Sequence, residues 1–160
     1  MKNDYLKDLG YLGVTARIKR LSDALSSGIK DLYLANNVDI EPSWHLLLLY
    51  LKEKKQSTLS EVAEAFRFSQ PAANKMITRM LKKGYIDITV DDKDNRKKIL
   101  RLSAKAKKNM PKFEKIWDAG QNSVREMLKS NHDFLSSLDI FELQHESKNF
   151  AERAKAKIKK

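Results

Sequence analysis

The side chains with the clearest chemical pattern are hydrogen-bond donors and cations that recur along residues 69–83. Amides pair with adenine edges, hydroxyls bond bases or phosphates, and lysine and arginine neutralise phosphates or pair with guanine. Helical spacing places these groups on one face, and Ala72, which can pack on a thymine methyl, lies beside them. The predicted contacts to double-stranded DNA from this segment are Ser69, Gln70, Ala72, Asn74, Lys75, Thr78, Arg79 and Lys82.

The same segment has the signals of a capped amphipathic helix. Ser69 is a favourable N-cap, Pro71 falls in the first turn where a missing N–H is harmless, and Gly84 is a favourable helix stop. The face opposite the donors carries one apolar stripe, formed by Ala73, Met76, Ile77, Met80 and Leu81. An ordinary surface helix has the same pattern, so its interpretation depends on the neighbouring elements.

A second helix is expected just before this one. Thr58 and Glu61 have the T-x-x-E spacing of a capping box, and an apolar stripe continues from Leu59 to Phe66. Only a tight connection at 67–68 then separates the two helices. A short helix, a short turn and a donor-rich helix follow one another with helix-turn-helix spacing, which makes 69–83 the predicted recognition helix.

A β-hairpin is expected after the recognition helix. Beyond Gly84 the apolar period changes to two, with Ile86, Ile88 and Val90 alternating with polar residues, and 98–102 read as a second strand. A helix-turn-helix followed by a hairpin is a winged helix. The tip carries four cations, Lys93, Arg96, Lys97 and Lys98. A basic tip can reach phosphates or an adjacent minor groove, which we expect of Arg96, although a solvated charged turn is the simpler alternative.

Positive charge is concentrated in the same third of the chain. The formal net charge is +11, and residues 57–110 hold 13 Lys and Arg against 6 Asp and Glu, a net of +7. A uniform lysine-rich surface would not concentrate in one third of the chain. The distribution therefore favours a polyanion partner for the central module.

Composition excludes several other classes of function. There is no cysteine, which removes disulfides and thiolate chemistry, and His45, His132 and His145 lack the spacing of metal ligands. Neither a membrane-spanning segment nor the apolar core of a signal peptide is visible, so we expect a cytoplasmic protein with no membrane contact. No catalytic motif or phosphate-binding glycine loop is present, and we expect no enzyme activity and no cofactor.

Long amphipathic helices flank the winged module on both sides. One is expected over 4–36, with a break near Gly10–Gly13. A second is expected from 104 towards 129, capped by Ser103 and with a kink or split at Pro111, and a last helix from about 134 to 158. A module of this size does not need so much helix for its own core, so we expect a homodimer through these helices. The predicted interface residues are Tyr5, Leu6, Leu9, Phe134, Leu135, Leu138, Phe141 and Phe150.

The expected fold is therefore mainly α, a winged helix-turn-helix with a short β-hairpin wing between dimerisation helices. The predicted parts are 1–40 for dimerisation, 41–102 for DNA binding and 103–160 for dimerisation. Within the central part, a helix is expected to start at 41–42, with Pro42 in its first turn. It is apolar nearly all round, which predicts that it forms the core. Two-fold symmetry would place the recognition helices about 34–36 Å apart, one turn of B-form DNA.

With these features the chain resembles the MarR family of bacterial and archaeal winged-helix regulators. The resemblance is most specific over STLSEVAEAFRFSQPAANKMITRMLKKGYIDITVDDKDNRKKILRLS, residues 57–103. Many members have D-x-R-D-x-R in the wing; here Asp91, Lys93, Asp94 and Arg96 stand at those places, so lysine replaces the first arginine. The resemblance implies that Asp94 orients a wing arginine, and that the protein is a repressor that binds a pseudo-palindromic operator.

The resemblance also implies regulation by a small aromatic or anionic effector. In the family such a molecule binds between the dimerisation helices and the winged module and weakens the DNA complex. The residues that could line this cleft are Tyr11, Arg17, Trp44, His45 and Trp117, although a place in the core is the favoured explanation for both tryptophans. The segment LGYLGVTARIKRLSDALS is further similar to MarR-like modules fused to acetyltransferases, and here we expect a stand-alone regulator.

Two other functions remain open on the sequence alone. A winged helix can serve as a protein–protein interaction module, which would not need Lys75, Arg79 and a basic wing together. A nonspecific DNA-binding protein would use the same cations but would tolerate any site sequence.

Overall fold

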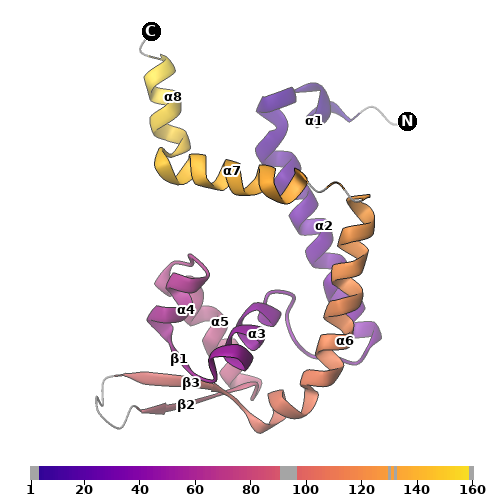
Figure 1. Ribbon diagram of the computed structural model, residues 1–160, viewed down its shortest axis with the longest axis vertical. Coiled ribbons are helices and arrows are strands. Elements are labelled where there is room, and N and C mark those ends of the chain that lie inside the picture. Colours follow the sequence, from indigo (N-terminus) through magenta and orange to yellow (C-terminus); the bar gives the residue numbers. More distant parts are fainter. Residues whose placement is uncertain (1–3, 91–96, 130, 132, 159–160) are drawn as a thin grey trace. The chain divides into compact units, whose positions relative to one another are not determined.

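The computed structural model describes residues 4–90, 97–129, 131 and 133–158. The chain forms two compact units, residues 1–118 and 119–160, and each is described by itself. Figure 1 labels the elements along the chain. Within the described residues no helix is both long enough and apolar enough to cross a membrane.

The first unit begins with three helical segments, α1 (Tyr5–Asp8), the 3₁₀ helix η1 (Gly10–Gly13) and α2 (Val14–Ala35). The break predicted near Gly10–Gly13 is therefore confirmed. Gly10 has a φ of +53°, and a Cβ at Gly13 would lie 2.1 Å from the Leu6 carbonyl oxygen. Because only glycine permits that approach, α1 can fold back beside the start of α2.

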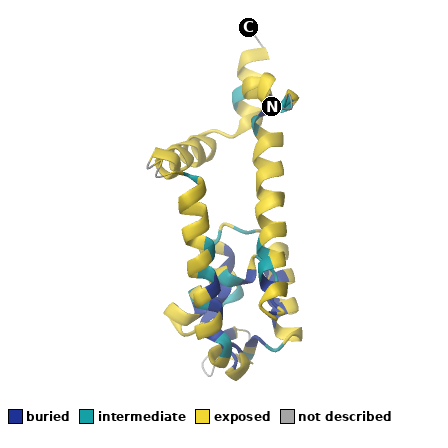
Figure 2. Cartoon of the chain, turned by 90° about the vertical axis from the view of Figure 1, so that its right-hand side faces the viewer, coloured by how far each residue is buried: buried dark blue, intermediate teal, exposed yellow. Residues whose placement is uncertain are grey.

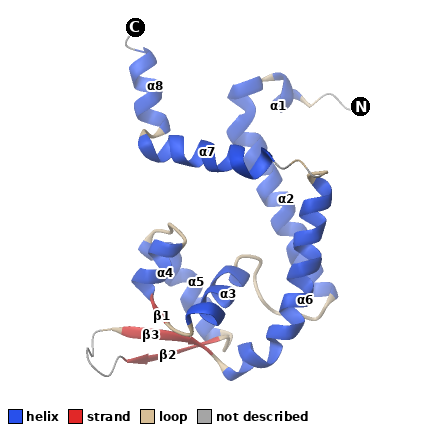
Figure 3. Cartoon of the chain, viewed as in Figure 1, coloured by secondary structure: helices blue, strands red, loops and turns tan. Residues whose placement is uncertain are grey.

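The winged module follows in the order α3 (Trp44–Lys54), β1 (Ser57–Thr58), α4 (Leu59–Ala65), α5 (Gln70–Lys82), β2 (Ile86–Val90) and β3 (Lys98–Leu102). The predicted mainly α winged helix is confirmed. Figure 3 shows the small sheet in red beside α3, α4 and α5. Pro42 lies in the turn before α3, so this helix begins two residues later than the position of the proline suggested.

The sheet has three antiparallel strands in the order β1-β3-β2. β3 is central: Leu100 pairs with Ser57 on one side and with Ile88 on the other. The hairpin was expected, whereas β1 was not, because Ser57–Thr58 was interpreted only as the start of a helix. Thr58 has both roles, since it pairs with Ile99 and also caps α4.

The core of the first unit is centred on α3. Trp44, Leu47, Leu48 and Leu51 are all buried, and they pack among buried residues of α4, α5, the sheet and α6. Figure 2 shows the buried residues in dark blue, gathered within the winged module and the parts of α2 and α6 that adjoin it. Leu46 and Leu49 on the remaining face of α3 are partly exposed, so the helix is less enclosed than its composition suggested.

α6 (Ala104–Met127) leaves the sheet and enters the second unit. It continues through Pro111, so the split considered at this proline does not occur, although Figure 1 shows the ribbon bending in the first half of the helix. Within the first unit α6 buries Ala106, Met110, Phe113 and Ile116. The proline lies on the exposed side, where a missing backbone hydrogen bond can be replaced by water.

The second unit also contains α7 (Asp133–Ser147) and α8 (Phe150–Ile158). One helix was expected over this range, so the division between α7 and α8 is a correction. Asn149 and Glu152 exchange backbone and side-chain hydrogen bonds of 3.2 and 3.1 Å, which is a capping box that starts α8. Arg153 then donates to the Lys148 carbonyl at 2.7 Å and satisfies the end of α7.

Candidate nucleic-acid interface

The start of the recognition helix is fixed by its N-cap. Ser69 has extended backbone angles, and its hydroxyl accepts a hydrogen bond of 3.3 Å from the Ala72 amide. Pro71 occupies the first turn, as predicted. At the other end Gly84 has a φ of +73°, a conformation that strongly favours glycine. Sequence therefore placed both ends of α5 to within one residue.

The helix before it is held by the predicted capping box. The Thr58 amide donates to Glu61 Oε2 at 2.7 Å, and the Glu61 amide donates to Thr58 Oγ1 at 3.2 Å. The hydrogen bond from the Thr58 amide is the main reason that the pKa of Glu61 lies below its ordinary value. In the turn, Arg67 has a φ of +52° and the Phe68 amide bonds the Ala63 carbonyl at 2.8 Å.

All eight predicted contacts on the recognition helix are exposed, while Ala73, Met76, Ile77 and Met80 on the other side are buried. The amphipathic pattern is therefore realised with the donor face outward. Leu81, which was placed on the apolar stripe, is 43% exposed and lies at its edge. The exposed face can offer amides, hydroxyls and cations to a groove of DNA without rearrangement of the core.

Arg79 differs from the other donors because it is already paired. Its Nη1 lies 2.8 Å from Glu41 Oε2, in the segment between α2 and α3. This ion pair was not predicted, because the two residues are far apart along the chain and no local sequence pattern indicates that they are in contact. The alternation of Val38, Asp39, Ile40 and Glu41 was the only available hint that the acids point outward.

The wing contributes two described cations to the predicted interface. Lys97 and Lys98 are exposed, whereas Lys93, Asp94 and Arg96 lie outside the described residues. A further cation, Arg101, was not predicted. Its guanidinium donates to Thr89 Oγ1 at 3.0 Å and to Gln56 Oε1 at 3.2 Å, so it links β2 and β3 to the residue just before β1.

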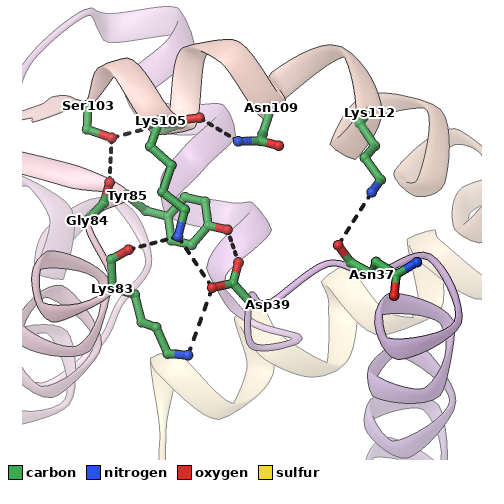
Figure 4. Close-up of polar contacts among 10 residues, drawn as sticks. Asn37, Asp39, Lys83, Gly84, Tyr85, Ser103, Lys105, Asn109 and Lys112 are labelled. Atoms are coloured by element: carbon green, nitrogen blue, oxygen red, sulfur yellow. Dashed lines mark hydrogen bonds and ion pairs between the residues drawn. The ribbon is translucent and has the colours of Figure 1, made fainter.

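A polar cluster joins the end of the recognition helix to α6, as Figure 4 shows. The Asp39 carboxylate accepts hydrogen bonds from the Tyr85 hydroxyl and, at 3.3 Å, from Lys105 Nζ. Although burial raises the pKa of Asp39, these two donors outweigh it and hold the pKa below its ordinary value. Burial, together with the adjacent carboxylate, raises the pKa of Tyr85.

The five residues predicted to line an effector cleft do not gather at one place. Only two of them are in ring contact: the His45 and Trp117 rings are 6.1 Å apart, and Trp117 Nε1 donates to the Tyr33 hydroxyl at 2.9 Å. The Trp44 ring instead packs edge-on against Tyr85, with the ring centres 5.9 Å apart. Trp44 is 1% exposed and its Nε1 has no hydrogen-bond partner among the described residues. Tyr11 and Arg17 are exposed near the opposite end of α2 from Tyr33.

Six of the eight residues predicted to form a dimer interface are exposed within one chain, and two are half-buried. Tyr5 is 71% exposed, and Leu6 and Leu9 are half-buried. In the second unit the exposed set is Phe134, Leu135, Leu138, Phe141 and Phe150. Large apolar side chains exposed in such numbers on neighbouring turns are typical of a surface that another chain covers.

Comparison with known proteins returns one family and many similar folds. The model of the MarR family matches residues 38–97, and no curated protein matches the sequence. A mutant MarR from E. coli complexed with operator DNA is 17% identical, with a TM-score of 0.66 over 89% of this chain and 98% of that one. The S. aureus MepR–DNA complex is 17% identical, with a TM-score of 0.69 over 82% and 96%.

A third structure extends the comparison to an archaeal protein. A MarR transcriptional regulator from Methanosarcina mazei Go1 is 17% identical, with a TM-score of 0.64 over 84% of this chain and 96% of that one. At these identities the likeness shows a shared fold, which covers most of both chains and extends beyond the winged module.

Proposed function

We propose that the protein is a transcription regulator of the MarR type that binds double-stranded DNA as a homodimer. The match of the MarR family model to residues 38–97 supports this proposal and agrees with the resemblance seen in the sequence. One observation carries the functional proposal: a capped helix presents its donors and cations to solvent and its apolar side to the core. That arrangement fits insertion into a major groove.

The cations around this helix support a DNA partner over a protein partner. Lys75, Lys82, Lys97 and Lys98 are all exposed on the recognition helix and the wing, in the third of the chain with a net charge of +7. Each phosphate that they neutralise would release counterions and strengthen binding at low salt. A module for protein–protein contact has no need of this excess.

The exposed apolar residues of α1, α7 and α8 support the homodimer. A second copy of the chain would cover them and would bring a second recognition helix to the opposite half of a pseudo-palindromic site. We extend the proposal to repression, by occupation of an operator that overlaps a promoter. Such a protein would act where the DNA lies, in the cytoplasm of a bacterial or archaeal cell.

Two neighbouring features at the start of α3 support an effector site. His45 and Trp117 form an aromatic pair, and the indole N–H of the adjacent Trp44 is buried and lacks a partner among the described residues, which favours a ligand that can accept a hydrogen bond. A small aromatic carboxylate such as benzoate is the probe that this chemistry suggests. It should quench tryptophan fluorescence and weaken DNA binding together, and a quench without release would remove the effector role.

Selection of bound sites from random duplex DNA, repeated at two salt concentrations, tests the main proposal. A pseudo-palindromic consensus is the expected result. Retention without a consensus would identify a nonspecific DNA-binding protein. A failure to retain any duplex at low salt would point to a protein partner instead.

A further inference from the structure

The segment between α2 and α3 places acidic side chains against the recognition helix. We call residues 38–41 the acidic strap. Val38 and Ile40 are each 6% exposed, whereas the side chains of Asp39 and Glu41 are 51% and 42% exposed. This alternation is that of an extended chain whose every second residue enters the core. Both acids therefore face outward on the same side.

The spacing of the two acids matches that of two cations, Arg79 in the last turn of α5 and Lys83 at its C-cap. Glu41 pairs with Arg79 at 2.8 Å, and Asp39 lies 3.9 Å from Lys83 Nζ. Two residues of extended chain span about 6.6 Å and four residues of helix about 6 Å. The strap therefore runs beside the last turns of the recognition helix and presents one carboxylate to each turn.

The strap is fixed in place by contacts that do not involve Arg79. Besides its buried side chains, Asp39 accepts from the Tyr85 hydroxyl and from Lys105 Nζ, as Figure 4 shows. Lys105 also donates to the Lys83 carbonyl at 3.0 Å and lies 4.0 Å from the centre of the Tyr85 ring. These contacts fix the backbone of the acidic strap on the N-terminal side of Glu41. The Glu41 carboxylate is therefore preorganised to pair with Arg79.

We propose that Glu41 is a specificity-determining residue: its ion pair with Arg79 keeps the guanidinium away from the phosphates of nonspecific DNA. This inference rests on the proposed DNA-binding function. An exposed ion pair is worth up to about fivefold in affinity, which is comparable to one phosphate contact. A bidentate pair with a base edge is worth about 5- to 150-fold. Glu41 therefore competes well with phosphates, which every sequence offers, and poorly with a matching base.

Glu41→Gln tests the proposal because it keeps the size of the side chain and removes the charge. Affinity for random-sequence duplex should rise about two- to fivefold. The slope of log affinity against log salt should steepen by about 0.9, the value for one additional phosphate contact. Affinity for the selected site should rise less, so the ratio of specific to nonspecific affinity should fall.

Asp23→Asn is the matched control for the change in net charge. Asp23 is also exposed and also pairs with a cation, Lys19 at 2.9 Å, but it lies on α2. It should leave the salt slope unchanged. Urea midpoints of both variants separate binding effects from stability effects, because a purely structural Glu41 would lower the midpoint and lower both affinities in E41Q.

A double-mutant cycle with Arg79→Ala locates the effect. Without Arg79 there is no guanidinium to release, so E41Q should no longer raise the affinity for random duplex. An equal rise in both backgrounds would overturn the proposal, because Glu41 would then act only by general repulsion. If wild-type protein binds duplex and E41Q matches it, only the role of Glu41 falls, whereas failure of the wild type to bind removes the DNA-binding function itself.

Discussion

The Ser103 hydroxyl donates a hydrogen bond of 2.7 Å to the Gly84 carbonyl and accepts one of 3.1 Å from the Ala106 amide. One buried side chain thus satisfies the first turn of α6 and the end of the recognition helix together, as Figure 4 shows. The residue was predicted as the cap of the helix that starts at 104. Its bond to Gly84 makes it a link between the end of the recognition helix and α6.

Ser103→Ala should lower the free energy of unfolding by about 1–3 kcal/mol, because it leaves a buried amide and a carbonyl without partners. Urea denaturation at neutral pH measures this loss. Ser123→Ala is the matched control: Ser123 is exposed and, within the part of the chain that the structure describes, its hydroxyl bonds only the Ala119 carbonyl of its own helix. Equal midpoints for the two variants would contradict the assigned role of Ser103.

Gly84→Ala should destabilise the protein by about 1–2 kcal/mol, since a Cβ in this left-handed conformation is strained. There is open space around Gly84, so the whole cost is conformational. Gly28→Ala should change stability in the opposite direction. Gly28 lies within α2 with nothing near its Cβ position, and alanine there should stabilise the helix by up to about 1 kcal/mol. Thermal unfolding of both variants checks the two signs.

Arg79→Ala should weaken binding to the selected site by about 1–3 kcal/mol if Arg79 reads a base. The change should leave stability within about 0.5 kcal/mol, because the residue is exposed and its ion pair is a surface one. Fluorescence anisotropy of labelled duplex measures the binding. Lys30→Ala removes the same charge from α2 and should leave affinity unchanged; a similar loss in both would mean that net charge alone matters.

Acid should destabilise the junction around Asp39. Its pKa is lower in the folded protein than in the unfolded chain, so its contribution is present above the unfolded value. That contribution is lost as the pH falls through the lower, folded value. Asp39→Asn should therefore reduce the difference between the urea midpoints at pH 7 and pH 3. NMR titration of the Asp39 carboxyl gives a direct check, and an unshifted or raised pKa would contradict the cluster.

Sizing of the wild-type chain should show a mass near twice 18.5 kDa. Leu135→Glu combined with Phe141→Glu should produce monomers, because covering each apolar side chain on association is worth about 1.5–3 kcal/mol. Val90→Glu, at an exposed apolar position of β2, should leave the dimer intact. Monomers in the wild type would remove the two-half-site model.

The recognition helix and the hairpin could be predicted because their signals are local. Ser69, Pro71 and Gly84 specify the ends of α5 within 16 residues of chain, and the change of period marks β2. β1 has no such signal: two residues form a strand only because Leu100, far along the chain, lies beside Ser57. The Glu41–Arg79 pair could not be predicted for the same reason, since it depends on how the strap crosses the helix.

The end of the chain shows a different kind of error. Asn149 and Glu152 have the spacing of a capping box, so the start of α8 was readable, yet the apolar positions on either side suggested one continuous helix. Pro111 predicted a kink or a split of the helix, and the helix does not split there. It tolerates the proline because this residue lies on its exposed side. The assignment of the exposed terminal residues to a dimer stays a prediction.

The pairing of β1 with β3 has a consequence for the order in which the protein folds during synthesis. The recognition helix is translated before β3, the strand that joins β1 to β2 and so closes the sheet around the two helices. On the ribosome, α4 and α5 are therefore complete before the sheet can form, because β1 and β2 both pair with residues 98–102. Until then α3 and α4, which pack against β3, lack part of their cover, and the exposed apolar surface makes the nascent chain prone to proteolysis and aggregation.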